Sequence, residues 1–281
     1  MRPALFIMLE TWLIAELAAL GLVTGLLAGL LGIGGGMLMV PFITFILTQR
    51  GVASDLAVKM AIATSMATIL FTSLSSVRAH HRRGAVRWDL VRNLSPGIVI
   101  GSLLAGAGVF HVIPGRWLAL LFAAFIAFSA TQMLRSAGQS QDKPSRGLPG
   151  PAGQFAAGGA IGFVSGLVGA GGGFISVPFM TWCGVVMHQA VATSAALGFP
   201  IALANGAGYL WSGASVAGRP PGSLGYVFLP ALAVLATASV LMAPLGVRLA
   251  HALPVAALKR VFALLLYALA ATMTWEALRA G

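Results

Sequence analysis

One stretch of this chain occurs twice, and the repeat constrains the fold more than any other feature. The segment from Gly32 to Thr44 matches the segment from Gly169 to Thr181 at eight of thirteen positions, including three consecutive glycines and a Val-Pro-Phe triplet. Glycines spaced four residues apart precede both segments: Gly21, Gly25 and Gly29 in the first, and Gly158, Gly162 and Gly166 in the second. The chain therefore contains two copies of one unit, and each copy interrupts an apolar segment with the same glycine cluster.

The composition places both copies in a membrane. Hydrophobic residues make up 58% of the chain, charged residues 8%, and the mean hydropathy is +0.94. Several apolar runs reach the roughly 20 residues that a membrane-spanning helix needs. The net charge of +11 would suggest nucleic acid in a soluble protein. Here the basic residues gather in a few loops, as the positive-inside rule expects, so the expected partner is the lipid bilayer and no nucleic acid.

The hydropathy pattern predicts an all-α polytopic membrane protein with about 8–10 membrane segments. Residues 1–135 form the first repeat, 136–152 a cytoplasmic linker rich in Gly, Pro and Ser, and 153–281 the second repeat. The short pieces Met37 to Thr48 and Phe174 to Gly184 are too short to span a bilayer, so we expect re-entrant or half-helices. Longer spans are expected at 12–31, 56–77, 94–110, 117–134, 154–168, 188–211, 226–247 and 255–277.

Charge indicates how the two halves are related. Five arginines follow Val77 in residues 78–92, and we place this loop in the cytoplasm. The equivalent loop of the second half, Ser212 to Gly225, carries only Arg219. A basic-rich loop thus corresponds to a basic-poor one, as expected of an inverted-topology repeat. Eight simple spans with parallel halves remain the alternative.

The glycine breaks favour binding of an anion. Backbone amides exposed by such a break must line a polar cavity or be buried in protein, and the helix that restarts after the break points its positive end into it. Two related breaks would bring two such ends together near the midplane. The predicted anion-binding residues are the glycines of both breaks, hydroxyl residues that follow them, one amide and two basic residues: Gly34, Gly35, Gly36, Gly171, Gly172, Gly173, Thr64, Ser65, Thr193, Ser194, Asn205, Lys59 and His188.

Each of these features has a plainer interpretation. Glycine clusters, and the Thr and Ser residues after them, also serve helix packing, while Lys59 and His188 resemble residues that reach the membrane interface. The second half has no carboxylate inside a span, and the first has only Glu16, which favours an anion over a cation. A cation-coupled carrier and a non-transporting scaffold subunit remain the alternatives. Motifs of hydrolytic enzymes are missing from the sequence, so we expect no catalytic residue, cofactor or bound metal. Stripes of small residues are compatible with a homodimer.

The paired Gly-x-Gly-Gly-Gly-x-x-x-Val-Pro motifs resemble those of the TauE/SafE family, the sulfite exporter family. Two further repeated elements carry the same resemblance: Ala-Thr-Ser at 63–65 and 192–194, and His-x-x-Pro at 111–114 and 251–254. The resemblance implies a multi-pass permease of the bacterial inner membrane that exports small anions, with sulfite and organosulfonates as the expected substrates. Alternating access between the two halves is the expected mechanism.

Overall fold

The structure is a computed structural model that describes residues 11–31, 35–136, 147–250 and 255–279. Helices account for about 82% of the structure, and the prediction of an all-α polytopic membrane protein is confirmed. Within the described residues, seven helices are long and apolar enough to cross a membrane, and two apolar helical segments are shorter, at Gly36–Gln49 and Ala263–Trp275. The seven long helices and the two shorter segments make nine apolar segments, which agrees with the predicted 8–10 membrane segments.

Each half contains five α-helices in the same order. The first half consists of α1 (Thr11–Leu31), α2 (Gly36–Gln49), α3 (Ser54–His81), α4 (Trp88–Leu103) with the π-helix η1 (Leu104–Val109), and α5 (Gly115–Ser136). The second half consists of α6 (Pro151–Val168), α7 (Gly173–Trp182), α8 (Met187–Ser212), the strands β1 (Ser223–Leu224) and β2 (Val227–Phe228), α9 (Leu229–Ala250) and α10 (Val255–Arg279). The π-helix and the β1–β2 hairpin were not predicted, and the span expected at 226–247 begins only at Leu229, after the hairpin.

The two halves pack on each other reciprocally. Helix α1 of the first half packs against α9 of the second, and α6 of the second packs against α4 of the first. The equivalent helices α3 and α8 contact each other, as do α5 and α10. Helices α3 and α8 are the most buried of the candidate spans, so they form the centre of the bundle.

Glycines permit the close approach of α1 to α9 and of α4 to α6. A Cβ atom at Gly25 would overlap the backbone of Ser239, and one at Gly29 would overlap the carbonyl oxygen of Ala243. The α4–α6 pair behaves in the same way, since a Cβ at Gly97 would meet Phe155 O and one at Gly101 would meet Gly159 O. Small residues at such positions let helix backbones come together without side chains between them.

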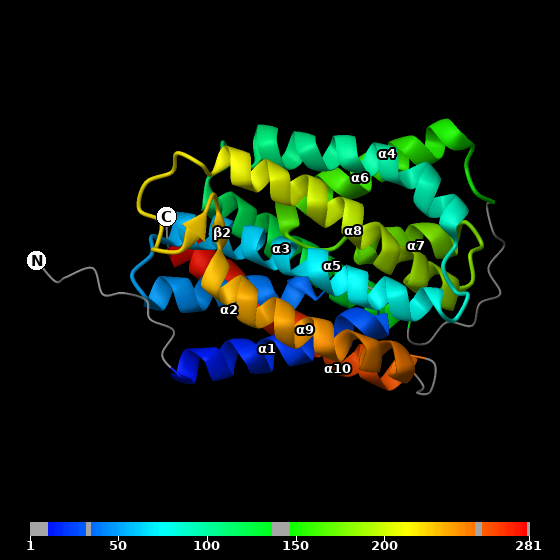
Figure 1. Ribbon diagram of the computed structural model, residues 1–281, viewed down its shortest axis with the longest axis horizontal. Helices are drawn as coiled ribbons and strands as arrows, with labels where there is room; N and C mark the ends of the chain where they lie inside the picture. The colour runs from blue at the N-terminus through cyan, green and yellow to red at the C-terminus, as the bar shows by residue number, and fades with distance from the viewer. Residues whose placement is uncertain (1–10, 32–34, 137–146, 251–254, 280–281) are drawn as a thin grey trace, which may run out of the picture.

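The order of these contacts gives the direction of the helices. Residue numbers rise together along α1 and α9, and along α4 and α6, so each pair is parallel. In Figure 1, α1 and α9 run toward the right and α4 and α6 toward the left. The turn between α3 and α4, with Arg82 and Arg83, lies at the right end, and the β1–β2 hairpin lies at the left. We refer to these as the arginine-rich end and the hairpin end.

Candidate functional site

The two glycine breaks have the same backbone conformation. Gly35 precedes α2 with φ of 72°, and its counterpart Gly172 precedes α7 with φ of 75°. Both lie in the left-handed region, which only glycine adopts without strain. The first two residues of α2 and of α7 are buried, so both helices begin inside the bundle. Gly34, also predicted in the site, lies outside the described residues.

The breaks of the two halves meet beside α3. A Cβ atom at Gly36, the first residue of α2, would overlap the carbonyl oxygen of Gly169 in the second break. Ser65 of α3 donates its hydroxyl to the same oxygen at 3.2 Å, and to Ile62 O at 2.9 Å. The start of α2 thus lies against the second break, and the Ser65 hydroxyl holds that break against α3.

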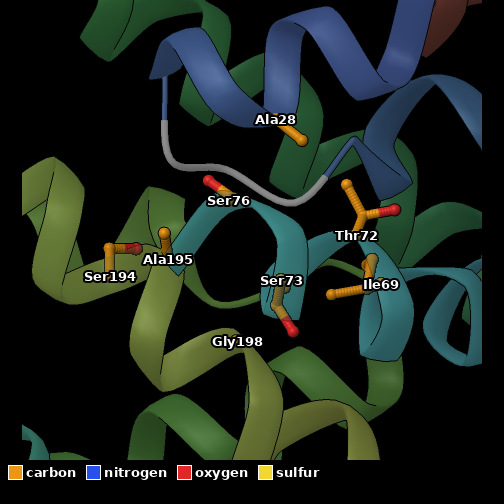
Figure 2. A pocket seen from close by; sticks show the side chains of 9 residues that line it. Ala28, Ile69, Thr72, Ser73, Ser76, Ser194, Ala195 and Gly198 are labelled. Carbon is orange, nitrogen blue, oxygen red and sulfur yellow. The ribbon is translucent and has the colours of Figure 1, made fainter. Parts of the chain in front are cut away.

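A small cavity, which we call the central cavity, lies where α1, α3 and α8 come together next to the second break (Figure 2). Its volume is about 10 Å³, enough for about one water molecule. Figure 2 shows Ala28 of α1 on one side, four residues of α3 on another, and three of α8 facing them. The lining residues are Ala28, Ile69, Thr72, Ser73, Ser76, Gly171, Ser194, Ala195 and Gly198.

The hydroxyl groups of the central cavity differ in how they are held. Thr72 shares a hydrogen bond of 2.6 Å with Ser239 of α9, and Ser73 donates to Leu70 O at 3.0 Å. Ser194 accepts a hydrogen bond of 2.9 Å from Ser176 of α7. Ser76 is 2% exposed, and its oxygen has no hydrogen-bond partner among the described residues. The Ser76 hydroxyl is therefore available to a ligand at little cost.

Thr64 and Thr193 do not face the central cavity. Thr64 accepts a hydrogen bond from the Phe228 backbone N–H at 3.0 Å, just before α9 begins. Thr193 accepts one from the Arg87 backbone N–H, also at 3.0 Å, where α4 begins. In both halves the threonine therefore satisfies a backbone donor of a helix start in the other half.

Asn205 also lies away from the central cavity, between α8 and α6. Its Nδ2 donates to Ile201 O at 3.0 Å, and its Oδ1 packs against Gly166, which has no room for a Cβ atom. Tyr209, one turn further along α8, donates its hydroxyl to Gly166 O and packs on the ring of Phe110. These contacts pack Asn205 between α8 and α6.

Lys59 and His188 lie at opposite ends of the bundle. Lys59 donates to His111 O at 3.1 Å and lies 3.4 Å from the carboxylate of Asp55, at the hairpin end. His188 is exposed in the first turn of α8, at the arginine-rich end. Neither contributes to the central cavity. Glu16, the carboxylate considered for a cation carrier, is exposed on α1.

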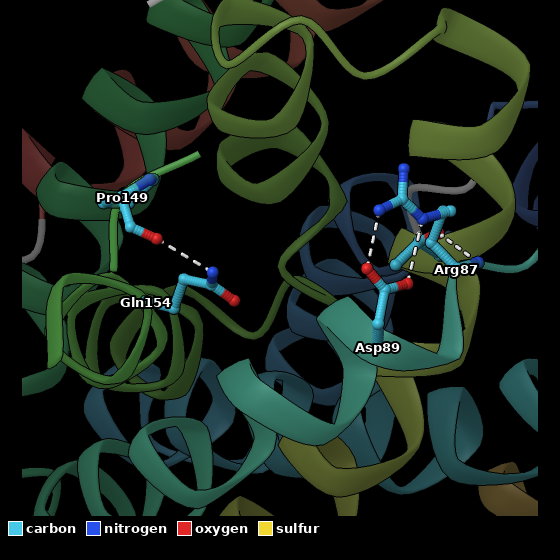
Figure 3. Close-up of polar contacts among 5 residues, drawn as sticks. Arg87, Asp89, Pro149 and Gln154 are labelled. Carbon is cyan, nitrogen blue, oxygen red and sulfur yellow. Dashed lines mark hydrogen bonds and ion pairs between the residues drawn. The ribbon is translucent and has the colours of Figure 1, made fainter. Parts of the chain in front are cut away.

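Figure 3 shows polar contacts at the arginine-rich end. Arg87 and Asp89 form an ion pair of 2.6 Å, and this hydrogen bond raises the pKa of Arg87. Both side chains are largely exposed, so the pair contributes at most about 1 kcal/mol to stability. Gln154 donates to Pro149 O at 2.9 Å at the start of α6. We find no ligand-directed geometry in these contacts.

The sequence suggested part of this cavity and missed the rest. Ser194 and Gly171 were predicted, whereas Thr72, Ser73 and Ser76 were not assigned to the site. Their signal is the spacing of residues 69, 72, 73 and 76, which places one small polar patch on one face of α3. Counted from Thr64 and Thr193, the α8 equivalents of Thr72 and Ser76 are Ile201 and Asn205. The hydroxyl patch is therefore a property of the first half alone.

The long apolar helices define a polytopic membrane protein, and comparisons with known proteins identify its class as membrane transporters. The chain is 34% identical over 253 residues to a probable membrane transporter protein of Haemophilus influenzae, a match that covers 90% of this chain and 95% of that protein. It is 27% identical to a probable membrane transporter protein of Methanocaldococcus jannaschii, over 84% of this chain and 86% of that protein. It is 29% identical to the Bacillus subtilis probable membrane transporter protein YunE, over 70% of this chain and 78% of that protein.

Residues 17–273 match the sulfite exporter TauE/SafE family. The chain belongs to this family, as its repeated motifs suggested. No solved structure matches the chain.

Proposed function

We propose that the protein is a secondary permease for small anions, with sulfite and organosulfonates as substrates. The observation that carries this proposal is the central cavity, in which hydroxyl groups and the backbone of a glycine break meet at the contact between the two halves. None of its lining residues is acidic. An anion at this position would be held by the Ser76 hydroxyl and by the positive end of α7, which begins two residues after Gly171.

The proposed mechanism is alternating access between inverted repeats in an inner membrane. It is supported by the reciprocal pairing of α1 with α9 and of α6 with α4, and by the opposite directions of the two pairs in Figure 1. A cavity of about 10 Å³ is smaller than any sulfur oxyanion, so α3 and α8 must separate for a substrate to enter. In this proposal the described conformation is closed.

The arginine-rich end is the cytoplasmic end in this proposal, because the turn from Arg82 to Arg87 is the most basic part of the bundle. The membrane potential, negative inside, then favours export of an anion by about 2.3 kcal/mol per charge for each 100 mV. An export direction therefore needs no coupling ion.

Ligand-induced thermal stabilisation of the purified protein tests this proposal. The panel comprises sulfite, sulfate, methanesulfonate, isethionate and acetate as sodium salts, with matched potassium salts to separate anion from cation effects. A ligand at about 100 times its Kd adds about 2.7 kcal/mol to stability. A shift with sulfite or a sulfonate, equal for both cations, is expected. A shift that follows the cation instead would contradict the anion site.

A further inference from the structure

A second cavity lies at the hairpin end, between the starts of α3 and α5 and the end of α10. Its volume is about 240 Å³, far larger than that of the central cavity. Its polar lining consists of Ser54 and Asp55 of α3 and Arg116 of α5, and its apolar lining includes Val58 and Met273. We call it the hairpin-end cavity. A small oxyanion such as sulfite fits a space of this size.

Three charged side chains among the described residues lie in or beside this cavity: Asp55, Lys59 and Arg116. Asp55 accepts the backbone N–H of Gly115, and its other oxygen lies 3.4 Å from Lys59 Nζ, so Lys59 offsets its charge. Arg116 lies over the ring of Trp117, with 5.3 Å between the guanidinium carbon and the ring centroid. Among the described residues, no carboxylate forms an ion pair with Arg116. The planar guanidinium of Arg116 can bind an oxyanion in a bidentate manner.

The two cavities share one face of α3. Residues 54, 55 and 58 line the hairpin-end cavity, and residues 72, 73 and 76 line the central cavity. The offset of 18 residues is five full turns of an α-helix, so both sets have the same orientation around the helix axis. Between them on this helix, Ile62 and Ser65 contact Gly169 of the second break. The two cavities and the second break therefore lie along one face of α3.

We propose that the hairpin-end cavity is a second binding site for a small oxyanion, with Arg116 as its principal ligand. The site receives or releases the anion that the central cavity carries, and in this respect it rests on the proposed function. The aromatic ring of Trp117 supports the guanidinium, and Ser54 offers a hydroxyl donor. Asp55 favours a ligand that also carries a hydrogen-bond donor.

Sulfite labelled with ³⁵S is the probe for this site, in equilibrium dialysis of the detergent-solubilised protein and in uptake by proteoliposomes. Arg116→Gln is expected to weaken sulfite binding about tenfold, the value of one charge-assisted contact. Uptake at low sulfite should fall by a similar factor, while uptake at saturating sulfite is retained. Arg116→Lys should recover part of the loss. Arg50→Gln, which changes an arginine at the same end outside the cavity, serves as the matched control and should bind as the unmodified protein does.

The outcomes separate this inference from the proposed function. If the unmodified protein transports sulfite and Arg116→Gln binds and transports it normally, the hairpin-end site is wrong and the permease proposal stands. If the unmodified protein does not transport sulfite, the permease proposal fails. The hairpin-end site is then judged from sulfite binding alone. Loss of binding in Arg116→Gln but not in Arg50→Gln then supports the site, whereas absent or equal binding overturns it.

A lipid phosphate offers the same oxyanion chemistry as a free solute. Native mass spectrometry with added dioctanoyl phosphatidylglycerol distinguishes the two sources. A lipid adduct that Arg116→Gln loses and excess sulfite does not displace would assign the site to a lipid headgroup. An adduct that sulfite displaces would assign it to the solute, and an adduct unchanged in Arg116→Gln would exclude the lipid from this site.

Discussion

The hydroxyls of Thr64 and Thr193 make the same contact in the two halves of the chain. Each accepts, at 3.0 Å, the backbone N–H of a residue that precedes a helix of the other half: Phe228 before α9, and Arg87 before α4. Both threonines are completely buried. A repeated sequence element, Ala-Thr-Ser, thus produces a repeated contact between the halves, and this contact has a structural consequence that can be measured.

Replacement of either threonine by valine should lower stability without changing anion binding. The substitution keeps the shape of the side chain and leaves one N–H group unpaired, which costs about 1–2 kcal/mol. Thr64→Val should cost more, because its donor is the buried N–H of Phe228. Thermal unfolding in detergent measures the effect, and Thr237→Val, at an exposed position where the hydroxyl bonds within its own helix, is the control. Normal stability with lost anion binding would instead place Thr193 in the site.

Ser76→Ala should reduce anion binding and leave stability unchanged. The Ser76 hydroxyl lines the central cavity and has no partner among the described residues, so its removal breaks no hydrogen bond. The matched control is Ser102→Ala, because Ser102 is also fully buried with an unpaired hydroxyl but does not line this cavity. Ligand-induced thermal shifts should fall for Ser76→Ala only. Equal responses in both variants would remove Ser76 from the site.

Gly25→Ala and Gly162→Ala, at equivalent positions of the two repeats, should both prevent correct packing. A Cβ atom at Gly25 would overlap the backbone of Ser239, and one at Gly162 would overlap Ile98 O. Because backbone atoms cannot move aside as flexible side chains do, we expect a loss of several kcal/mol, seen as poor recovery of monodisperse protein. Gly206→Ala is the control, since nothing lies within 4 Å of a Cβ atom there. Equal recovery of all three variants would contradict the described helix pairs.

Inversion of the two halves predicts opposite accessibility of equivalent loops. Arg83→Cys, in the turn after α3, should react with an impermeant maleimide from the cytoplasmic side, and Ser215→Cys, in the loop after α8, from the opposite side. The native Cys183 should contribute little background, because its thiol is buried. Labelling of both introduced cysteines from one side would favour parallel halves.

The helical architecture could be predicted from the sequence because a cluster of glycines interrupts a helix at a definite position. The repeated breaks were located correctly, with Gly35 and Gly172 in matching left-handed conformations. Helix ends differed by a few residues, and the hairpin before α9 was missed because Tyr226 to Phe228 are as apolar as the helix that follows. Length and hydropathy do not distinguish these three residues from a helical turn.

The individual site residues were harder to predict, because a buried hydroxyl can face a cavity or a backbone donor. Thr64 and Ser76 lie in the same helix and have similar polarity, yet one binds the N–H of Phe228 and the other lines the central cavity. Which role each takes depends on helices that are distant in sequence. Lys59 and Asn205 were placed in the predicted site by residue type, and tertiary contacts assign them to other parts of the bundle.

The central claim, that the cavity between α3 and α8 carries small anions, is tested most directly by flux. Uptake of ³⁵S-sulfite into proteoliposomes is measured with a valinomycin-imposed potential of either sign, for the unmodified protein and for Ala195→Leu, which fills the central cavity. Uptake that increases when the interior is positive, and that is lost in a folded Ala195→Leu variant, is the predicted result. Uptake that does not respond to the potential, or that Ala195→Leu retains in full, would contradict the account.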